Sequence, residues 1–191
     1  LGDPTFQVRY RKGILAFRNL RSHYGSTRYN GNVSINLLRN RIFVNAEFPF
    51  VDSKDMLDVF SRQVTLPFSI SGTGAATLRA SGPLEFSRLS YTLDSALYRG
   101  HIANESFDQF IFNVESKDGY VDTRKVEITR GASHIELAGK AYPNAQINAR
   151  LVGKNIRLEQ SENLSRLKVA AAGQLDFSSQ LKGHILEPQS S

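Results

Sequence analysis

Apolar and polar residues alternate with a period of two along most of this chain. The pattern is clearest from Ile42 to Phe50 and from Val64 to Ile70, where almost every second residue is apolar. Successive side chains of a β-strand point to opposite faces, so each run predicts a strand with one apolar and one polar face. The same alternation predicts strands at Val33/Ile35/Leu37, Phe110/Phe112/Val114, Val126/Ile128, Ile135/Leu137, Ile147/Ala149/Leu151 and Leu167/Val169/Ala171.

Glycine-containing segments separate these runs and predict turns between them. Asn30-Gly31 and Asp118-Gly119 are the strongest, because both central residues of a tight hairpin turn need positive φ angles. Further turns are expected at Gly25, Gly72, Gly74 and Gly82. The sequence therefore predicts an all-β fold, an elongated, curved and mostly antiparallel sheet of many short strands.

One segment departs from the alternation. Residues 52–62 place Met56, Leu57 and Phe60 at helical spacing, after a Ser53 that is suited to cap a helix. We expect a short helix here that packs on a neighbouring sheet, because an apolar helix face mostly serves the core.

A faint internal repeat accompanies the strands. Sliding the chain by 101 residues superposes residues 66–72 on residues 167–173 and aligns Gly72 with Gly173. Such a repeat is typical of folds that grow by adding strands and contact mainly their neighbours. The sequence predicts repeat units at about 25–85 and 130–185, within a single β-rich segment, residues 1–191, of a longer repetitive protein.

Composition narrows the class of protein. The 191 residues are 40% hydrophobic and include no Cys. Apolar residues spread along the whole chain are not typical of a disordered protein, and the absence of Cys excludes disulfides, thiolate metal sites and Cys nucleophiles. Residues 1–41 carry eight Lys or Arg side chains and one acid, Asp3, whereas the rest of the chain is close to neutral.

This N-terminal positive charge predicts an anionic partner. Arginine binds phosphate and carboxylate through two parallel hydrogen bonds. The candidate contacts to an anionic headgroup or a polyanion are Arg9, Arg11, Lys12, Arg18 and Arg21. An acidic stretch of the same polypeptide and a basic face that only confers solubility are the alternatives. Nucleic acid is not expected, because the apolar strips continue far beyond the charged segment.

Sequence motifs for catalysis are missing. Residues 69–74 come nearest to a Gly-x-Ser-x-Gly nucleophile turn but lack the first glycine, and no phosphate-binding loop follows. The four His residues stand far apart, without the spacing of metal ligands. We therefore expect no enzyme activity, no cofactor and no metal site.

Residues 119–139, with the sequence GYVDTRKVEITRGASHIELAG, are followed by AQINARL at 145–151 and NIRL at 155–158. This stretch resembles the repeating strand units of the TamB and AsmA-like family. Such units contain a short apolar strand, a glycine-bearing turn, a strand that closes on Leu-x-Gly, and an Asn-Ile/Leu-x-Leu element. Residues 71–83, 175–178 and 181–183 resemble further strands of the same kind, so the resemblance covers about residues 25–185.

The resemblance implies a bacterial periplasmic protein of the cell envelope, anchored to the inner membrane in its full-length form. Its β-taco, a trough with an apolar concave side, implies bridge-like transport of phospholipid between the inner and outer membranes. The likeness to TamB, of the translocation and assembly module, also implies outer membrane biogenesis and an outer-membrane β-barrel assembly protein as partner. It implies no catalytic residue.

In such a trough, phospholipid acyl chains contact alternate residues of the strands. The candidate lining residues are Val64, Leu66, Phe68, Ile70, Phe110, Phe112, Val114, Ile135, Leu137, Ile147, Ala149 and Leu151. About 12–16 strands at ~4.8 Å spacing would extend ~60–75 Å. Alternation is also typical of an ordinary core face, and the alternative function is a structural or assembly scaffold that binds an outer-membrane β-barrel partner through a sheet edge.

Overall fold

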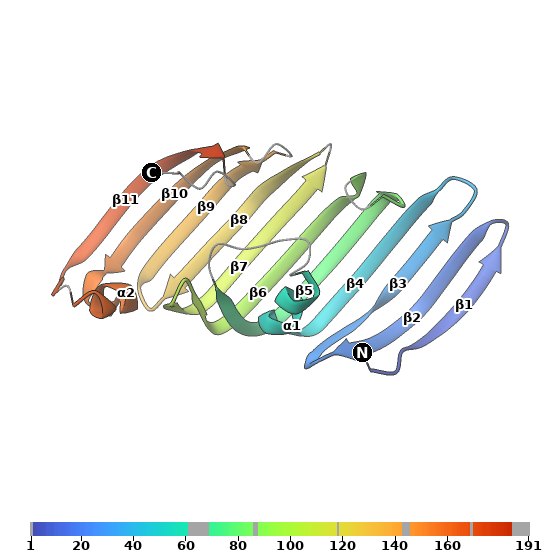
Figure 1. Ribbon diagram of the computed structural model, residues 1–191, viewed down its shortest axis with the longest axis horizontal. Helices are drawn as coiled ribbons and strands as arrows, with labels where there is room; N and C mark the ends of the chain where they lie inside the picture. Colours follow the sequence, from blue (N-terminus) through green and yellow to red (C-terminus); the bar gives the residue numbers. More distant parts are fainter. Residues whose placement is uncertain are drawn as a thin grey trace.

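The computed structural model describes residues 2–60, 69–85, 88–117, 119–142, 146–168 and 170–184. These residues form one antiparallel sheet of eleven strands, in which each strand pairs with its neighbours in the sequence (Figure 1). The strands are β1 (Thr5–Arg11), β2 (Ile14–Tyr24), β3 (Thr27–Asn36), β4 (Arg41–Asp52), β5 (Ile70–Pro83), β6 (Ser90–Ile102), β7 (Glu105–Lys117), β8 (Tyr120–Arg130), β9 (Ser133–Ala141), β10 (Gln146–Arg157) and β11 (Gln174–His184).

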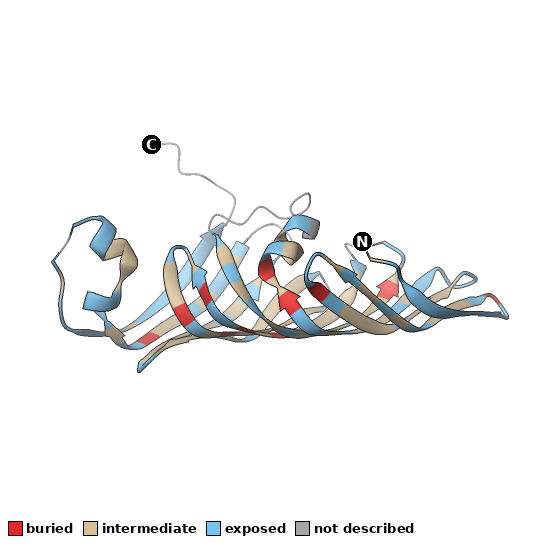
Figure 2. Cartoon of the chain, turned by 90° about the horizontal axis from the view of Figure 1, so that it is seen from below, coloured by how far each residue is buried: buried red, intermediate tan, exposed pale blue. Residues whose placement is uncertain are grey.

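The predicted fold class is confirmed. The sheet is open, elongated and curved, and Figure 2 shows two short helices on the same side of it. Helix α1 (Ser53–Phe60) connects β4 to β5, and a 3₁₀ turn, η2 (Leu158–Gln160), precedes helix α2 (Glu162–Arg166) in the connection from β10 to β11. The strands hold 7 to 14 residues, so they are longer than the sequence predicted. The described residues form eleven strands, which extend about 50 Å, so the sheet they form is shorter than the 12–16 strands and ~60–75 Å expected from the sequence.

The sheet is a single layer. The chain exposes 13065 Å² of surface, whereas a compact protein of its 21.3 kDa exposes about 9100 Å². Within the described ranges, the buried apolar side chains are Val51, Leu97, Phe107 and Phe110. Most apolar residues of this protein are therefore not enclosed between two layers of secondary structure.

The predicted turns are partly right. β7 and β8 meet at the expected place, where Lys117 pairs with Tyr120 and Gly119 has a φ of 83°. The prediction of a hairpin at Asn30-Gly31 is wrong, because both residues lie inside β3 and pair with β2 and β4. The turn between β2 and β3 lies earlier, at Gly25, where a turn was also expected and where φ is 57°.

Glycines inside strands explain why the strands are longer than predicted. Gly72, Gly74 and Gly82 lie within β5 and not in turns. A Cβ atom on Gly74 would lie 1.8 Å from the carbonyl oxygen of Ala96 on β6. Gly74 therefore marks a close approach of two strands, which is the other common reason for a glycine inside a strand.

A β-bulge in β4 moves one predicted apolar residue to the opposite face. The pairing of β4 with β5 shifts register between Phe48 and Val51. Phe50 pairs with Arg28 and is 38% exposed, whereas Val51 is buried. The prediction that Phe50 continues the apolar face of residues 42–48 is wrong, because the bulge adds one residue to the alternation.

The predicted repeat is only partly visible. Residues 61–68 and Val169 lie outside the described residues. Leu167 directly follows α2 and is 73% exposed, so the strand predicted to begin at Leu167 does not form there. The two superposed segments nevertheless share a setting. Each follows a helix that comes after a long strand, β4 in one case and β10 in the other.

Helix α1 begins as expected but with a different cap. The Asp52 carboxylate accepts a hydrogen bond from the backbone N–H of Lys54 at 2.9 Å. The hydroxyl of Ser53 is buried and has no partner among the described residues. Asp52 therefore caps α1, and the prediction of a Ser53 cap is wrong.

The close approach at Gly74 can be tested with the smallest side chain. Gly74→Ala should lower the free energy of unfolding by about 1–3 kcal/mol, because the added Cβ atom forces β5 and β6 apart. Gly183→Ala on β11 is the matched control, since nothing lies within 4 Å of its Cβ position. Urea unfolding followed by circular dichroism measures both. Equal losses in the two variants would contradict the proposed close approach.

Candidate functional site

The candidate site is the face of the sheet on which α1 packs, called the inner face below. Directly paired residues of an antiparallel sheet point to the same face, so the register identifies its members. Four rows of paired residues cross eight strands. From β4 to β11 they are Val51/Gly74/Leu97/Phe110/Ile128/Ile135/Gly153/Phe177, Phe48/Ala76/Ser95/Phe112/Val126/Leu137/Leu151/Ser179, Ala46/Leu78/Leu93/Val114/Thr123/Gly139/Ala149/Leu181 and Val44/Ala80/Tyr91/Ser116/Val121/Ala141/Ile147/Gly183.

None of these positions holds a charged residue or a histidine. The few polar members are Ser, Thr and Tyr residues, and the carbon atoms of these side chains can still contact hydrocarbon. From β4 to β10 most of the row residues are half-buried. The residues between them are largely exposed on β4, β5, β9 and β10, whereas on β6, β7 and β8 many of them are half-buried as well. The inner face is therefore a continuous apolar strip about eight strands wide.

The structure brings the described candidate lining residues together on this face. The four rows contain Phe110, Phe112, Val114, Ile135, Leu137, Ile147, Ala149 and Leu151. Ile70 packs against the buried cluster on the same face. Val64, Leu66 and Phe68 lie outside the described residues.

Sequence analysis missed several members of this face. Leu97 on β6 and Phe107 on β7 belong to the buried cluster. The β6 strand was not predicted, because Ser95 interrupts its apolar alternation. The alternation of Tyr91, Leu93 and Leu97 around this serine was the available signal.

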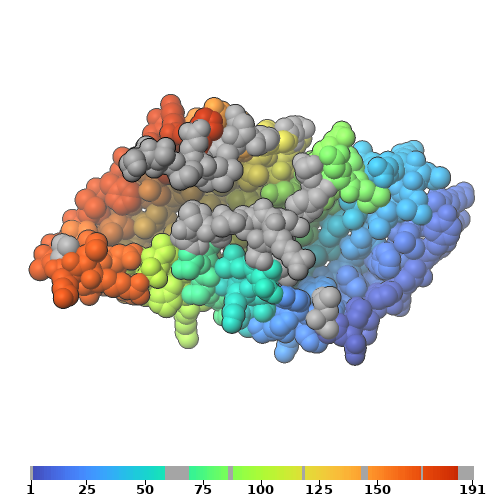
Figure 3. Space-filling model, viewed as in Figure 1, coloured from blue at the N-terminus to red at the C-terminus, as the bar shows by residue number. Residues whose placement is uncertain are grey.

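Helix α1 covers only part of the inner face. Its Met56 packs against the cluster of Val51, Leu97, Phe107 and Phe110. The rings of Phe110 and Phe112 stack with centroids 5.5 Å apart, so aromatic contacts continue from the covered cluster into the half-buried rows. Figure 3 shows this face of the molecule as a hollow between the two rims formed by the strand ends.

The opposite, outer face is mainly polar. The row that lies between the third and fourth apolar rows holds Arg79, Thr92, Glu115, Asp122, Lys140, Asn148 and Lys182, whereas the row between the first two mixes Ala75, Ala96, Ile111 and Val152 with Glu127, Glu136 and Ser178. The carboxylate of Glu127 pairs with Lys125 and lies 3.4 Å from His134. These contacts, and above all the hydrogen bond from Lys125, hold the pKa of Glu127 below its ordinary value. This side of the sheet is suited to contact with water or polar partners.

An aspartate fixes α1 to one rim of the sheet. The carboxylate of Asp55 accepts hydrogen bonds from the backbone N–H groups of Ser26 and Thr27, at 2.8 and 2.9 Å, and from both hydroxyls at 3.0 Å. Partial burial raises the pKa of Asp55, but these hydrogen bonds outweigh it and the pKa is lowered overall. The connection from β4 to β5 is thus tied to the turn between β2 and β3.

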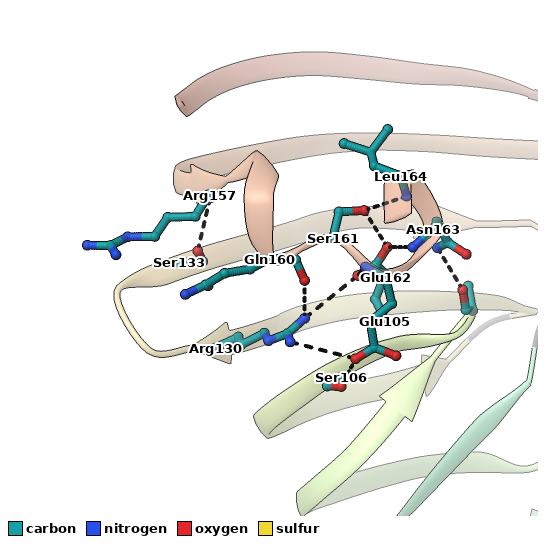
Figure 4. A network of polar contacts seen from close by, with 11 residues as sticks. Glu105, Ser106, Arg130, Ser133, Arg157, Gln160, Ser161, Glu162, Asn163 and Leu164 are labelled. Carbon is teal, nitrogen blue, oxygen red and sulfur yellow. Dashed lines mark hydrogen bonds and ion pairs between the residues drawn. The ribbon is translucent and has the colours of Figure 1, made fainter. Parts of the chain in front are cut away.

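A glutamate does the same for α2 at the same rim (Figure 4). Glu105 accepts hydrogen bonds from the hydroxyl of Ser161 at 2.7 Å and from the N–H groups of Glu162 and Asn163 at 3.0 and 2.9 Å. Burial raises the pKa of Glu105, but these donors outweigh it and lower the pKa overall. Arg130 lies 3.8 Å from Glu105 and 3.6 Å from Glu162, which links β8 to the same network.

The predicted cationic contacts lie on the other side of the sheet from the apolar rows. On the outer face, Gln7 pairs with Arg18, Arg9 pairs with Ala16, and Thr5 pairs with Arg21. Arg11 closes β1 on the same face, and Lys12 lies in the turn to β2. These cations and the candidate lining residues therefore cannot contact a bound molecule from the same side.

Other kinds of site are not found in the described parts of the chain. No group of three or more His, Asp or Glu side chains there could hold a metal ion. None of the described helices has the length and apolar character needed to cross a membrane. Comparisons with protein-family models, with curated proteins and with solved structures gave no match. The resemblance to the TamB and AsmA-like family therefore stays a prediction from the sequence.

The attachment of α1 can be tested by removing its anchor. In Asp55→Ala, the amides of Ser26, Thr27 and α1 should exchange with deuterium faster than in the original protein, because all four hydrogen bonds to the carboxylate are lost. Hydrogen exchange measured by mass spectrometry reports this. Asp94→Ala, an exposed acid on the outer face of β6, is the matched control. Unchanged exchange in Asp55→Ala would show that the carboxylate does not hold the helix.

The attachment of α2 should depend on pH. Because the pKa of Glu105 is lower in the folded protein than its ordinary value of about 4.3, its contribution to stability is complete above that pH. It declines as the pH falls below about 4.3 and is lost once the pH passes the lowered pKa. Hydrogen exchange of α2 at pH 6 and pH 3, each referred to a denatured control, should show this loss of protection. Glu105→Gln should remove most of the pH dependence, and an unaltered dependence would assign it to other carboxylates.

Proposed function

We propose that this protein binds phospholipid acyl chains in the trough formed by its inner face and transports them along it. The observation that carries the proposal is the set of four uncharged rows, which continue over eight strands and on which the described residues place no second layer apart from α1. An ordinary core face would be enclosed and dry. Here most of the apolar residues of the rows stay half-buried.

Acyl chains are suited to this surface because of how the binding energy is distributed. Each CH₂ group removed from water contributes about 0.8 kcal/mol, and this contribution depends on area and not on direction. Rows of Val, Leu, Ile, Phe and Ala offer similar contact at each step along the sheet. A lipid can then move from one strand to the next without falling into a single deep site.

The resemblance to the TamB and AsmA-like family supports the same function in a specific setting. On that basis we propose that the protein is part of a periplasmic bridge that carries phospholipid between the inner and outer membranes. The proposed chemistry is non-covalent, so no residue has a catalytic role. The headgroup would remain in water above the trough while the acyl chains contact the rows.

A second function is favoured by the first edge strand. The β1 residues Phe6, Val8 and Tyr10 are 45%, 55% and 66% exposed, and one edge of β1 has no neighbouring strand among the described residues. An exposed strand edge can pair with a strand of another protein. A scaffold that binds an outer-membrane β-barrel protein in this way is therefore the alternative, and it would carry no lipid.

Native mass spectrometry of the purified protein distinguishes these two functions. Co-purifying phospholipid is expected for the trough. A lipid-free protein that captures a barrel protein through β1, and loses it on Val8→Pro, would support the scaffold and contradict the trough.

Photo-crosslinking tests which face contacts lipid. A photoreactive amino acid at Leu137 or Leu151 should crosslink to phospholipid added as vesicles. The same amino acid at Glu136 or Val152, one residue away on the outer face, should not. Equal crosslinking on both faces would contradict a trough on the inner face.

A charge placed in the trough should weaken lipid binding. Leu151→Asp should reduce binding by about 2 kcal/mol, roughly thirtyfold, because two or three CH₂ contacts of ~0.8 kcal/mol are lost. Val152→Asp adds the same charge on the opposite face of β10 and should bind lipid as the original protein does. A fluorescent fatty-acid analogue titrated into each variant provides the measurement, and equal affinities would count against the proposed lining.

A further inference from the structure

The outer face of the first three strands holds an unusual concentration of arginine. Its positions on β1–β3 include Arg9, Arg11, Arg18, Arg21 and Arg28, all exposed, and no Asp or Glu. Arg41 continues the group on β4, where it lies over the ring of Phe43 with 5.9 Å to the ring centre. We call the five residues on β1–β3 the arginine face.

The arginines of this face lack protein partners. In the described part of the chain, none of the five forms an ion pair, whereas Glu115, Asp122 and Glu127 on β7 and β8 are all paired with cations. Register places Arg9 diagonally across from Arg18, and Arg21 diagonally across from Arg28. Diagonal neighbours are about 7–8 Å apart, so like charges repel here unless an external anion lies between them.

A depression opens on the same face. It has a volume of about 860 Å³, and its lining includes Arg21, His23 and Arg28, a single acid, Asp3, and the less polar residues Tyr29, Pro49 and Phe50. A shallow and cationic depression of this kind is suited to phosphate groups, to which arginine donates two hydrogen bonds at once.

The edge strand β1 combines this charge with exposed apolar side chains. Arg9 and Arg11 alternate with Val8 and Tyr10, so the two kinds of residue lie on opposite faces of one exposed strand. At a bilayer surface, phosphate and hydrocarbon lie within a few ångströms of each other. An arginine can then bind phosphate while a neighbouring aromatic residue contacts hydrocarbon.

We infer that the arginine face docks this end of the sheet on the surface of an anionic phospholipid bilayer. The phosphates of several headgroups would neutralise the unpaired arginines. With β1 turned edge-on to the bilayer, Val8 and Tyr10 on the other face of this strand would reach the adjoining acyl region. Nucleic acid fits less well, because the outer positions of β1–β3 include no Phe or Tyr, and on the paired outer positions of β4 only Phe43 and Phe50 could stack on bases. An acidic protein would match the charge but would leave the apolar side of β1 exposed.

The inference is independent of the proposed acyl-chain trough. Docking could hold even if the inner face carried no lipid, and the trough could hold even if the protein reached membranes by another surface. The arginine face is distant from Leu137 and Leu151, so variants of the two regions distinguish the two ideas.

Vesicle co-sedimentation of the purified protein tests the inference. The protein should bind vesicles of phosphatidylcholine with phosphatidylglycerol, and should bind much less to phosphatidylcholine alone. Arg9→Gln/Arg18→Gln/Arg21→Gln should reduce binding to the anionic vesicles about a hundredfold, because each arginine near the surface contributes several-fold. Binding should also weaken steeply as salt is added.

The matched control removes the same charge from the other end of the outer face. Arg150→Gln/Lys154→Gln/Lys182→Gln lies on β10 and β11 and should bind vesicles almost as the original protein does. Circular dichroism and thermal melting check that both triple variants fold. The inference is overturned if the two triple variants lose binding equally, if binding is insensitive to salt, or if a duplex or single-stranded oligonucleotide binds more tightly through the same three arginines.

Discussion

The backbone ladder that joins β4 to β11 is the interaction on which this structure depends. Because each strand pairs with its sequence neighbour, the register passes from one strand to the next and decides the face of every side chain. A shift by one residue would exchange the apolar and polar faces of a strand. The bulges in β4 and β8 add a residue and then restore the alternation, so that Val51 and Thr123 rejoin the inner rows. The continuity of the apolar strip is thus a property of the hydrogen-bonded register.

A single-layered sheet has little core with which to stabilise itself. The buried cluster around Leu97 and Phe110 lies under α1, and beyond it the rows are only half-buried. Stability must then come largely from contacts between neighbouring strands and from the two rim anchors. Asp55 and Glu105 each accept two hydrogen bonds from backbone N–H groups. Asp55 holds helix α1, which follows β4, and Glu105 holds helix α2, which follows β10. An antiparallel order places all connections that follow even-numbered strands at the same rim, so one rim is reinforced twice by the same chemistry.

The fold class and much of the inner face could be predicted from the sequence, because a strand's alternation is a local property. Phe112, Leu137 and Leu151 were placed correctly relative to their own strands, and register then brought them into one row. The turns were harder to predict, since glycine serves two purposes. Gly119 lies in a turn, whereas Gly74 lies where two backbones approach each other, and the local sequence does not distinguish these uses. The anchors Asp55 and Glu105 act on residues 28 and 58 positions away, which no local pattern reveals.

The two ends of the sheet differ in charge but not in the character of their apolar rows. A lining that contributes similar binding energy at every strand allows a lipid to move but favours neither direction. An asymmetry has to come from elsewhere in the molecule. The arginines of β1–β3 supply one, because they outnumber the outer-face cations of β10 and β11, Arg150, Lys154 and Lys182, and no acid lies among them, while Glu115 and Glu127 are paired with cations in the middle of the outer face. In the proposed function, the trough therefore provides passage and the arginine face provides orientation, and the two tasks are separated by placing them on opposite faces of the same strands.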